Sequence, residues 1–153
     1  MKITVNKQIA MNYKLINDDK QKTYAIILDD GEEAMEQIKS FAKKIQLSAS
    51  RFTAIGAFSD TTVGFFDFSI KDYKKIPLKE QMEVLTLNGD ITLFNDQYKI
   101  HAHVILGKED GRAYGGHLLK ATVHPTLEII LNESPAWLRR ETDAETGLAL
   151  IKI

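Results

Sequence analysis

The sequence predicts an α+β fold: an antiparallel or mixed β-sheet with one main amphipathic helix and a short second helix, in a single compact domain over residues 1–153. Three observations favour this class. Many short segments have the composition and alternation of strands, and one segment has the periodicity of a helix. The length of 153 residues suits one domain with one core. No linker, repeat or low-complexity segment divides the chain.

The composition is that of an ordinary globular protein, with 44% hydrophobic and 27% charged residues. The longest apolar runs fall far short of the about 20 residues that a membrane helix needs. Met1–Lys7 lacks the apolar stretch of an export signal. With no cysteine, disulfides and thiolate zinc sites are excluded, and a cytoplasmic location is expected. A net charge of -1 means that DNA binding would need a local basic patch.

The first half of the chain predicts four strands. Met11–Ile16 and Thr23–Leu28 are strand-like, and the polar segment between them indicates a turn. Arg51–Phe58 predicts a third strand, followed by a bend at Ser59–Asp60 and an aromatic strand at Thr62–Ile70. The glycines within these last two strands, Gly56 and Gly64, indicate a bulge or a close backbone approach.

The main helix is predicted over about residues 32–46. Asp30 is the expected N-cap, with Glu33 as its capping-box partner. The apolar positions recur at helical spacing: Ala34, Met35, Ile38, Phe41, Ala42 and Ile45. Three lysines lie on the opposite side: Lys39, Lys43 and Lys44. They form either a solvated face or a contact for phosphate groups.

The second half of the chain predicts more strands. Asp72–Pro77 is expected to be a loop. Asn88-Gly89-Asp90 predicts a tight hairpin turn, because Asn-Gly supplies positive φ angles. That turn would join the strands Met82–Leu87 and Ile91–Phe94. Ser134–Glu141 predicts the short helix, with Pro135 at its first position. Three further strands are expected: Tyr98–Leu106, Thr126–Leu131 and Leu148–Ile153.

Two histidines in the strand Tyr98–Leu106 are the strongest chemical signal. Side chains alternate along a strand, so His101 and His103 point the same way, about 6–7 Å apart. Gly107–Gly111 predicts a turn, and Gly115-Gly116 then precedes His117. Three imidazoles converging on zinc would leave one coordination position for water, which such a site can activate.

Other interpretations of these residues stay open. His101 and His103 could simply be exposed on a solvated strand face, with His117 unrelated to them. Glu128 lies in an apolar strand and is either a partner that orients a histidine or the exposed side of an edge strand. His124, which precedes a proline, is interpreted as a surface or turn residue with no role.

Two parts of the chain resemble the plant and prokaryote conserved (PPC) domain. The first is Arg51–Asp60 with the aromatic strand that follows it. The second comprises His101–His103, Asp110–Leu118 and Thr122–Glu128. The resemblance is strongest over residues 15–131, and the Gly-Gly-His segment is fairly specific.

This resemblance implies an α+β domain that assembles as a homotrimer and holds a metal, zinc, through His101, His103 and His117. In plants the domain follows AT-hook motifs, and prokaryotic members are often described as DNA-binding proteins. This chain has no AT-hook, so the part that would grip the minor groove is missing. His124 stands where the family has a small residue, often glycine, and it either adds a fourth nitrogen or fills space.

Three functions are consistent with these features. The first is a trimeric metal-binding protein without an assigned reaction, which as an enzyme would be a metal-dependent hydrolase or lyase. The second is a DNA-binding or regulatory protein with a local basic patch formed by Lys39, Lys43, Lys44, Lys71, Lys74 and Lys75. The third is an interaction module in which the trimer is the function. Phe65, Phe66 and Phe68 would then supply subunit contacts, unless they belong to the core.

Overall fold

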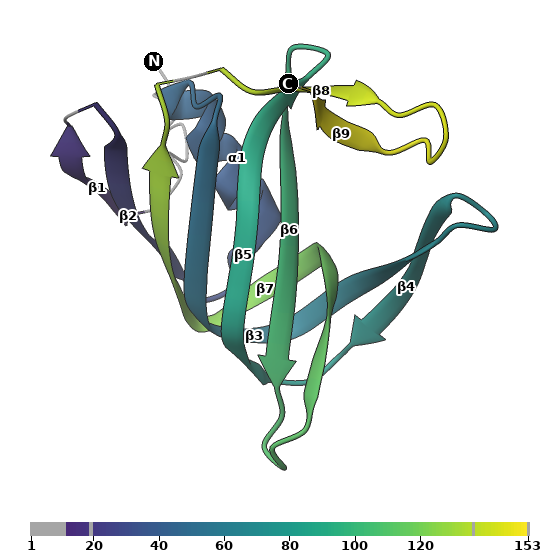
Figure 1. Cartoon of the computed structure of the whole chain (residues 1–153). Helices are drawn as coiled ribbons and strands as arrows, with labels where there is room; N and C mark the ends of the chain where they lie inside the picture. Colours follow the sequence, from purple (N-terminus) through teal and green to yellow (C-terminus); the bar gives the residue numbers. More distant parts are fainter. Residues whose placement is uncertain (1–11, 19, 136, 153) are drawn as a thin grey trace, which may run out of the picture.

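A computed structural model describes residues 12–18, 20–135 and 137–152 (Figure 1). Within these residues nine strands form one sheet, and a single helix, α1 (Ala34–Ile45), packs against it. The strands are β1 (Asn12–Asp18), β2 (Lys22–Asp29), β3 (Ser50–Asp67), β4 (Asp72–Leu78), β5 (Met82–Phe94), β6 (Gln97–Gly107), β7 (Ala113–Glu133), β8 (Arg139–Thr142) and β9 (Ala149–Lys152). The sheet with one main helix is therefore confirmed.

The sheet is mostly antiparallel and strongly bent. Its order is β1-β2-β7-β3-β5-β8-β9, with β4 paired to β3 and β6 paired to both β5 and β7. Among the strand pairings of the described residues, only the short β5–β8 pairing is parallel. The long strands β3, β5, β6 and β7 curve across the molecule, so β4 and the β8–β9 hairpin project on the same side (Figure 1).

Two predicted interruptions are absent, because tertiary packing overrides the local turn signals. The prediction of a bend at Ser59–Asp60 is wrong, because β3 continues through both residues as one strand of 18 residues. Its register shifts on both sides of Gly56, where an added Cβ would lie 2.2 Å from the carbonyl oxygen of Thr126. The bulge expected at Gly56 is thus confirmed, and it bends the strand without ending it.

The hairpin turn predicted at Asn88-Gly89 is also wrong, since β5 continues through both residues. Gly89 pairs with Phe52 of β3, and an added Cβ would lie 2.4 Å from the Phe52 ring. The glycine is needed for this close packing and not for a positive φ angle.

Helix α1 has a different N-cap from the one predicted, although its extent and its apolar face are confirmed. Its N-cap is Glu33 itself, whose Oε2 accepts a hydrogen bond from the backbone N–H of Glu36 at 2.7 Å. Asp30, the predicted cap, instead lies 2.7 Å from the Nδ1 atom of His124. Gln46 ends the helix in the left-handed region, at φ 60°. The residues that α1 buries against the sheet are Ala34, Ile38, Phe41 and Ala42.

Two further local predictions are wrong. The expected loop Asp72–Pro77 is strand β4, which pairs along its length with β3 and tolerates Pro77 because it lies at an edge of the sheet. The short second helix is absent from the described residues of Ser134–Glu141, and residues 139–142 form β8. There the Arg140 guanidinium binds Thr92, Asp90 and the carbonyl oxygen of Ala149, which ties β8 to β5 and β9.

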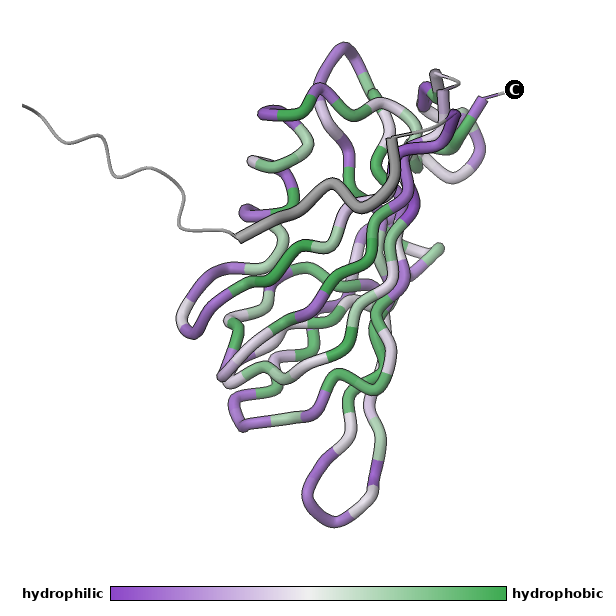
Figure 2. Tube along the Cα trace, turned by 90° about the vertical axis from the view of Figure 1, so that its left-hand side faces the viewer, coloured by the Kyte–Doolittle hydropathy of each residue, from purple (hydrophilic) through white to green (hydrophobic). Residues whose placement is uncertain are grey.

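The hydrophobic core lies between α1 and one face of the sheet, and no helix of the described residues covers the opposite face. Along the strands hydrophobic residues predominate, whereas hydrophilic residues gather at turns such as the one between β6 and β7 (Figure 2). Among the described residues no helix is long and apolar enough to cross a membrane. Met1–Lys7 and Met11, on which two predictions rested, lie outside the described residues.

Candidate metal centre

Strand β6 places two histidines side by side on the face of the sheet away from α1. Ala102 and Val104 are buried in the core, so the alternating residues His101 and His103 point outward, as predicted. Their Nε2 atoms lie 3.2 Å apart. The lone pairs of two nitrogens at this distance repel each other when neither nitrogen carries a proton. A proton or a metal cation shared between the two nitrogens relieves this repulsion.

The hairpin from β6 to β7 brings the third histidine to the same place. His103 and His117 are direct partners in the antiparallel ladder. The two glycines before His117 allow the strands to approach closely. A Cβ added at Gly115 would lie 2.8 Å from the carbonyl oxygen of Val104. A Cβ added at Gly116 would lie 2.9 Å from the carbonyl oxygen of Gly64. Both glycines are therefore needed where β7 approaches β6 and β3.

The three rings form one cluster. The His101 and His117 rings stack with centroids 5.2 Å apart, and the His103 ring meets both edge-on. One nitrogen from each ring lies within 4.8 Å of the others. Two ligands about 2.05 Å from a tetrahedral zinc ion are about 3.3 Å apart, so the His101–His103 pair already fits, and a small inward ring movement completes the set.

The pKa shifts of two of the histidines, His101 and His117, suit a metal. Burial lowers the pKa of His117 to about 4, and the nearby His101, His103 and Lys99 act in the same direction. Burial also lowers the pKa of His101, an effect that the Asp90 carboxylate opposes. An imidazole with a lowered pKa is neutral at pH 7 and keeps a lone pair free for a metal ion.

Sequence reasoning missed the residues that hold the histidines in place. Tyr73 of β4 stacks on the His117 ring with the ring centroids 4.5 Å apart, and its hydroxyl lies 3.5 Å from the Nδ1 atom of His117. Asp90 of β5 lies 3.8 Å from Nδ1 of His101 and is itself held by Arg140 at 2.7 Å. Tyr73, Asp90 and Arg140 come from segments predicted as a loop, a turn and a helix, so no local signal pointed to them.

The other candidates lie elsewhere. His124 pairs with Asp30 on the surface, and in the described part of the chain the histidine cluster does not include it. Glu128 is exposed on the part of β7 that pairs with β2 and β3, so it is not on an edge strand. It is three strand spacings from β6, about 14 Å, which is too far to orient a histidine.

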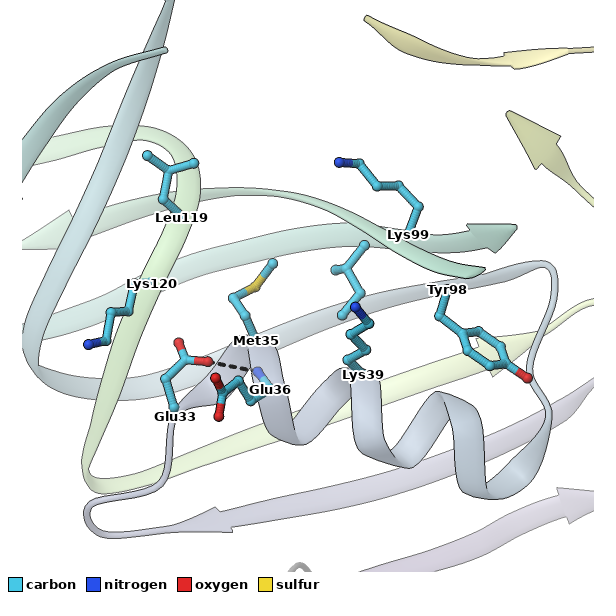
Figure 3. Close-up of a pocket in the computed structure, with 9 residues that line it drawn as sticks. Glu33, Met35, Glu36, Lys39, Tyr98, Lys99, Leu119 and Lys120 are labelled. Carbon is cyan, nitrogen blue, oxygen red and sulfur yellow. Dashed lines mark hydrogen bonds between the residues drawn. The ribbon is translucent and has the colours of Figure 1, made fainter. Parts of the chain in front are cut away.

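A larger cavity of about 380 Å³ lies on the opposite side of β6, against α1 (Figure 3). Its walls carry both charges, including Glu33, Lys39 and Lys120. The Glu33 carboxylate is already used, since it caps α1 and also accepts the backbone N–H of Ala121 at 2.9 Å. None of the described residues that border this cavity is a histidine.

In the absence of metal, the folded chain is expected to lose stability as the pH falls from about 6.5 toward 4. His117 takes up a proton near pH 6.5 when unfolded but only near pH 4 when folded. Between these values the unfolded chain binds more protons, so acidification favours unfolding. Urea denaturation at pH 7.5 and pH 5 measures this loss, which should be smaller for His117→Gln. An identical loss in both proteins would contradict the expectation.

Comparison with known proteins identifies relatives of this arrangement. A family model described as the Plants and Prokaryotes Conserved (PCC) domain matches residues 16–135. Two curated relatives, the bifunctional protein GlmU of two Synechococcus strains, are 29% and 28% identical over 129 residues. The match covers 82% of this chain but only 20% and 19% of those proteins, so the chain spans about a fifth of their length.

Solved structures from three organisms share the fold. A candidate DNA-binding protein of Bacteroides thetaiotaomicron has a TM-score of 0.84 and 26% identity, over 92% of this chain and 96% of that one. A plant- and prokaryote-conserved protein of Pyrococcus horikoshii has a TM-score of 0.81 and 34% identity, over 93% of this chain and 95% of that one. A protein of Archaeoglobus fulgidus described as metal-containing has a TM-score of 0.79 and 30% identity, over the full length of both chains.

Proposed function

Since this chain belongs to the Plants and Prokaryotes Conserved (PCC) domain family, we propose that it is a metal-binding member that holds zinc through His101, His103 and His117. The convergence of three imidazoles, each with a nitrogen within 4.8 Å of the others, carries this proposal. The similarity to a structure described as metal-containing supports it. We also propose a cytoplasmic location, because the sequence has no cysteine.

The donor set favours a reactive site over a purely structural one. Structural zinc sites usually have four protein ligands, whereas catalytic sites have three and keep a position for water or substrate. Zinc bound here would supply Lewis-acid chemistry. Tyr73 would orient the His117 ring, and Asp90 would orient the His101 ring, each through the Nδ1 atom of that ring. A metal-dependent hydrolase or lyase is the reaction class that fits this arrangement.

Titration of the metal-stripped chain with zinc tests the proposal. Saturation at one zinc ion per chain is the expected result, with a near-ultraviolet signal from Tyr73, which stacks on His117. Absence of a saturable site would reject the metal centre.

We further propose that copies of the chain assemble as a homotrimer through the sheet face that α1 leaves bare. Large apolar side chains are exposed there: Ile55 (59%), Leu85 (56%), Ile105 (47%) and Ile130 (46%). Ile55 and Ile130 border one cavity of about 470 Å³ on this face. Contiguous exposed apolar surface of this kind commonly marks a protein interface.

Ile130→Asp is expected to convert the trimer into monomers, because it places a charge in the apolar contact. Size-exclusion chromatography with light scattering measures the mass directly. Phe68→Asp is the matched control, since Phe68 is 71% exposed but lies beyond the end of β3, near β4. A trimer that survives Ile130→Asp but dissociates with Phe68→Asp would assign the contact to the aromatic residues Phe65, Phe66 and Phe68.

DNA binding is the alternative function, favoured by the similarity to a candidate DNA-binding protein. The lysines that could form a patch lie in two groups, one on α1 and one around β4, which occupy different parts of the chain (Figure 1). A continuous patch would therefore need the assembled trimer. Affinity for duplex DNA that falls steeply with added salt would support this alternative; affinity independent of salt would reject it.

A further inference from the structure

A small cavity opens beside the histidine cluster, on the face away from α1. It has a volume of about 100 Å³ and is bordered by His101 and His117. Tyr73 closes one side, and Leu148 and Leu150 of the β8–β9 hairpin close another. A molecule in this cavity can therefore reach a metal held by the histidines, while its remaining atoms lie against apolar side chains.

Two cations border the cavity, and they differ in whether they are already paired. The Arg140 side chain is buried, and its donors are used by Thr92, Asp90 and the Ala149 carbonyl oxygen. Lys99 is exposed and has no hydrogen bond or ion pair with any residue that the structure describes. It precedes His101 by two positions in β6, on the same face of the strand.

Lys99 borders both this cavity and the α1 cavity. In Figure 3 its side chain extends away from the α1 ribbon. Lys99 borders this cavity together with His101 and His117, and its positive charge helps to lower the pKa of both histidines. No carboxylate is among the described residues that border the cavity. With a divalent cation bound, the cavity would therefore be strongly positive and would favour an anion.

We propose that this cavity binds a short-chain carboxylate, whose carboxylate group lies between the metal position and Lys99 and whose apolar part lies against Leu148 and Leu150. This inference depends on the proposed metal centre. The small volume excludes drug-sized ligands, which occupy cavities of roughly 300–1,000 Å³. The leucines favour a hydrocarbon substituent over a fully polar anion such as phosphate.

Cobalt(II) loaded in place of zinc provides a test without an enzyme assay, because its visible absorption changes with its ligands. Titration of the cobalt protein with butyrate should give a saturable spectral change. Lys99→Met should weaken butyrate binding about tenfold, the usual effect of losing one charge-assisted contact. Lys120→Met, an exposed lysine of β7 that borders only the α1 cavity, is the matched control and should leave the affinity unchanged.

The outcomes separate the two proposals. Failure to bind cobalt would overturn the metal centre and this inference together. A cobalt spectrum that butyrate does not alter, or that it alters equally in Lys99→Met, would overturn the carboxylate site and leave the metal centre standing. Tighter binding of inorganic phosphate than of butyrate would overturn the assignment of the ligand class.

Discussion

His117→Ala is expected to lower the zinc affinity of the chain by about 100-fold or more. The substitution removes one of three nitrogen donors from a site whose other two, on His101 and His103, lie 3.2 Å apart on a single strand. Each ligand of a zinc site contributes on the order of 3 kcal/mol, which corresponds to a factor of about 100 in affinity. Competition with a chromophoric chelator measures the dissociation constant.

His124→Ala is the matched control for this prediction. His124 lies on the same strand, β7, and is exposed, but its Nδ1 atom is paired with Asp30 at 2.7 Å. Its removal should leave the zinc affinity unchanged. An equal loss of affinity in both variants would show that the metal is not held by the proposed three rings.

Gly89→Ala is expected to destabilise the fold by about 2–3 kcal/mol, the usual cost of overpacking a core. The new methyl group would lie 2.4 Å from the ring of Phe52, which is 2% exposed, and 2.9 Å from the carbonyl oxygen of His101. Neither neighbour can move freely, because one is in the core and the other is part of the β5–β6 ladder. Urea denaturation gives the free energy of unfolding.

Asn88→Ala separates this packing effect from the turn that the sequence predicts. In a continuous strand Asn88 is exposed, and its side chain donates a hydrogen bond to Thr86 on the same strand, so its loss should cost about 0.5 kcal/mol. A type I′ turn needs positive φ at both residues, and the two substitutions would then cost similar amounts. Equal destabilisation would contradict the continuous strand β5.

The parts of the site that were predictable depend on short-range rules. Alternation along β6 placed His101 and His103 on one face, and the turn at Gly107–Gly111 brought the next strand back beside them. The family resemblance joined His117 to that pair, and the register of β6 with β7 brings the three together. The alternation and the turn are local relations, which the sequence carries directly, whereas the place of His117 in the set rested on the resemblance.

The parts that were missed depend on contacts between distant segments. The choice between turn and strand at Gly89 is made by the Phe52 ring, 37 positions earlier in the chain. Arg140 belongs to a strand and not to a helix because its buried guanidinium binds Asp90 and Thr92. Tyr73 reaches His117 only because β4 folds back along β3. Periodicity and turn composition contain no information about such pairings.

The metal content of the purified protein tests the central claim most directly. Elemental analysis of the wild-type chain and of a His101→Ala, His103→Ala double variant should give about one zinc ion per chain in the first and almost none in the second. Circular dichroism should show that both are folded, because His101 and His103 lie outside the core. Equal zinc content in two folded proteins would contradict the three-histidine centre.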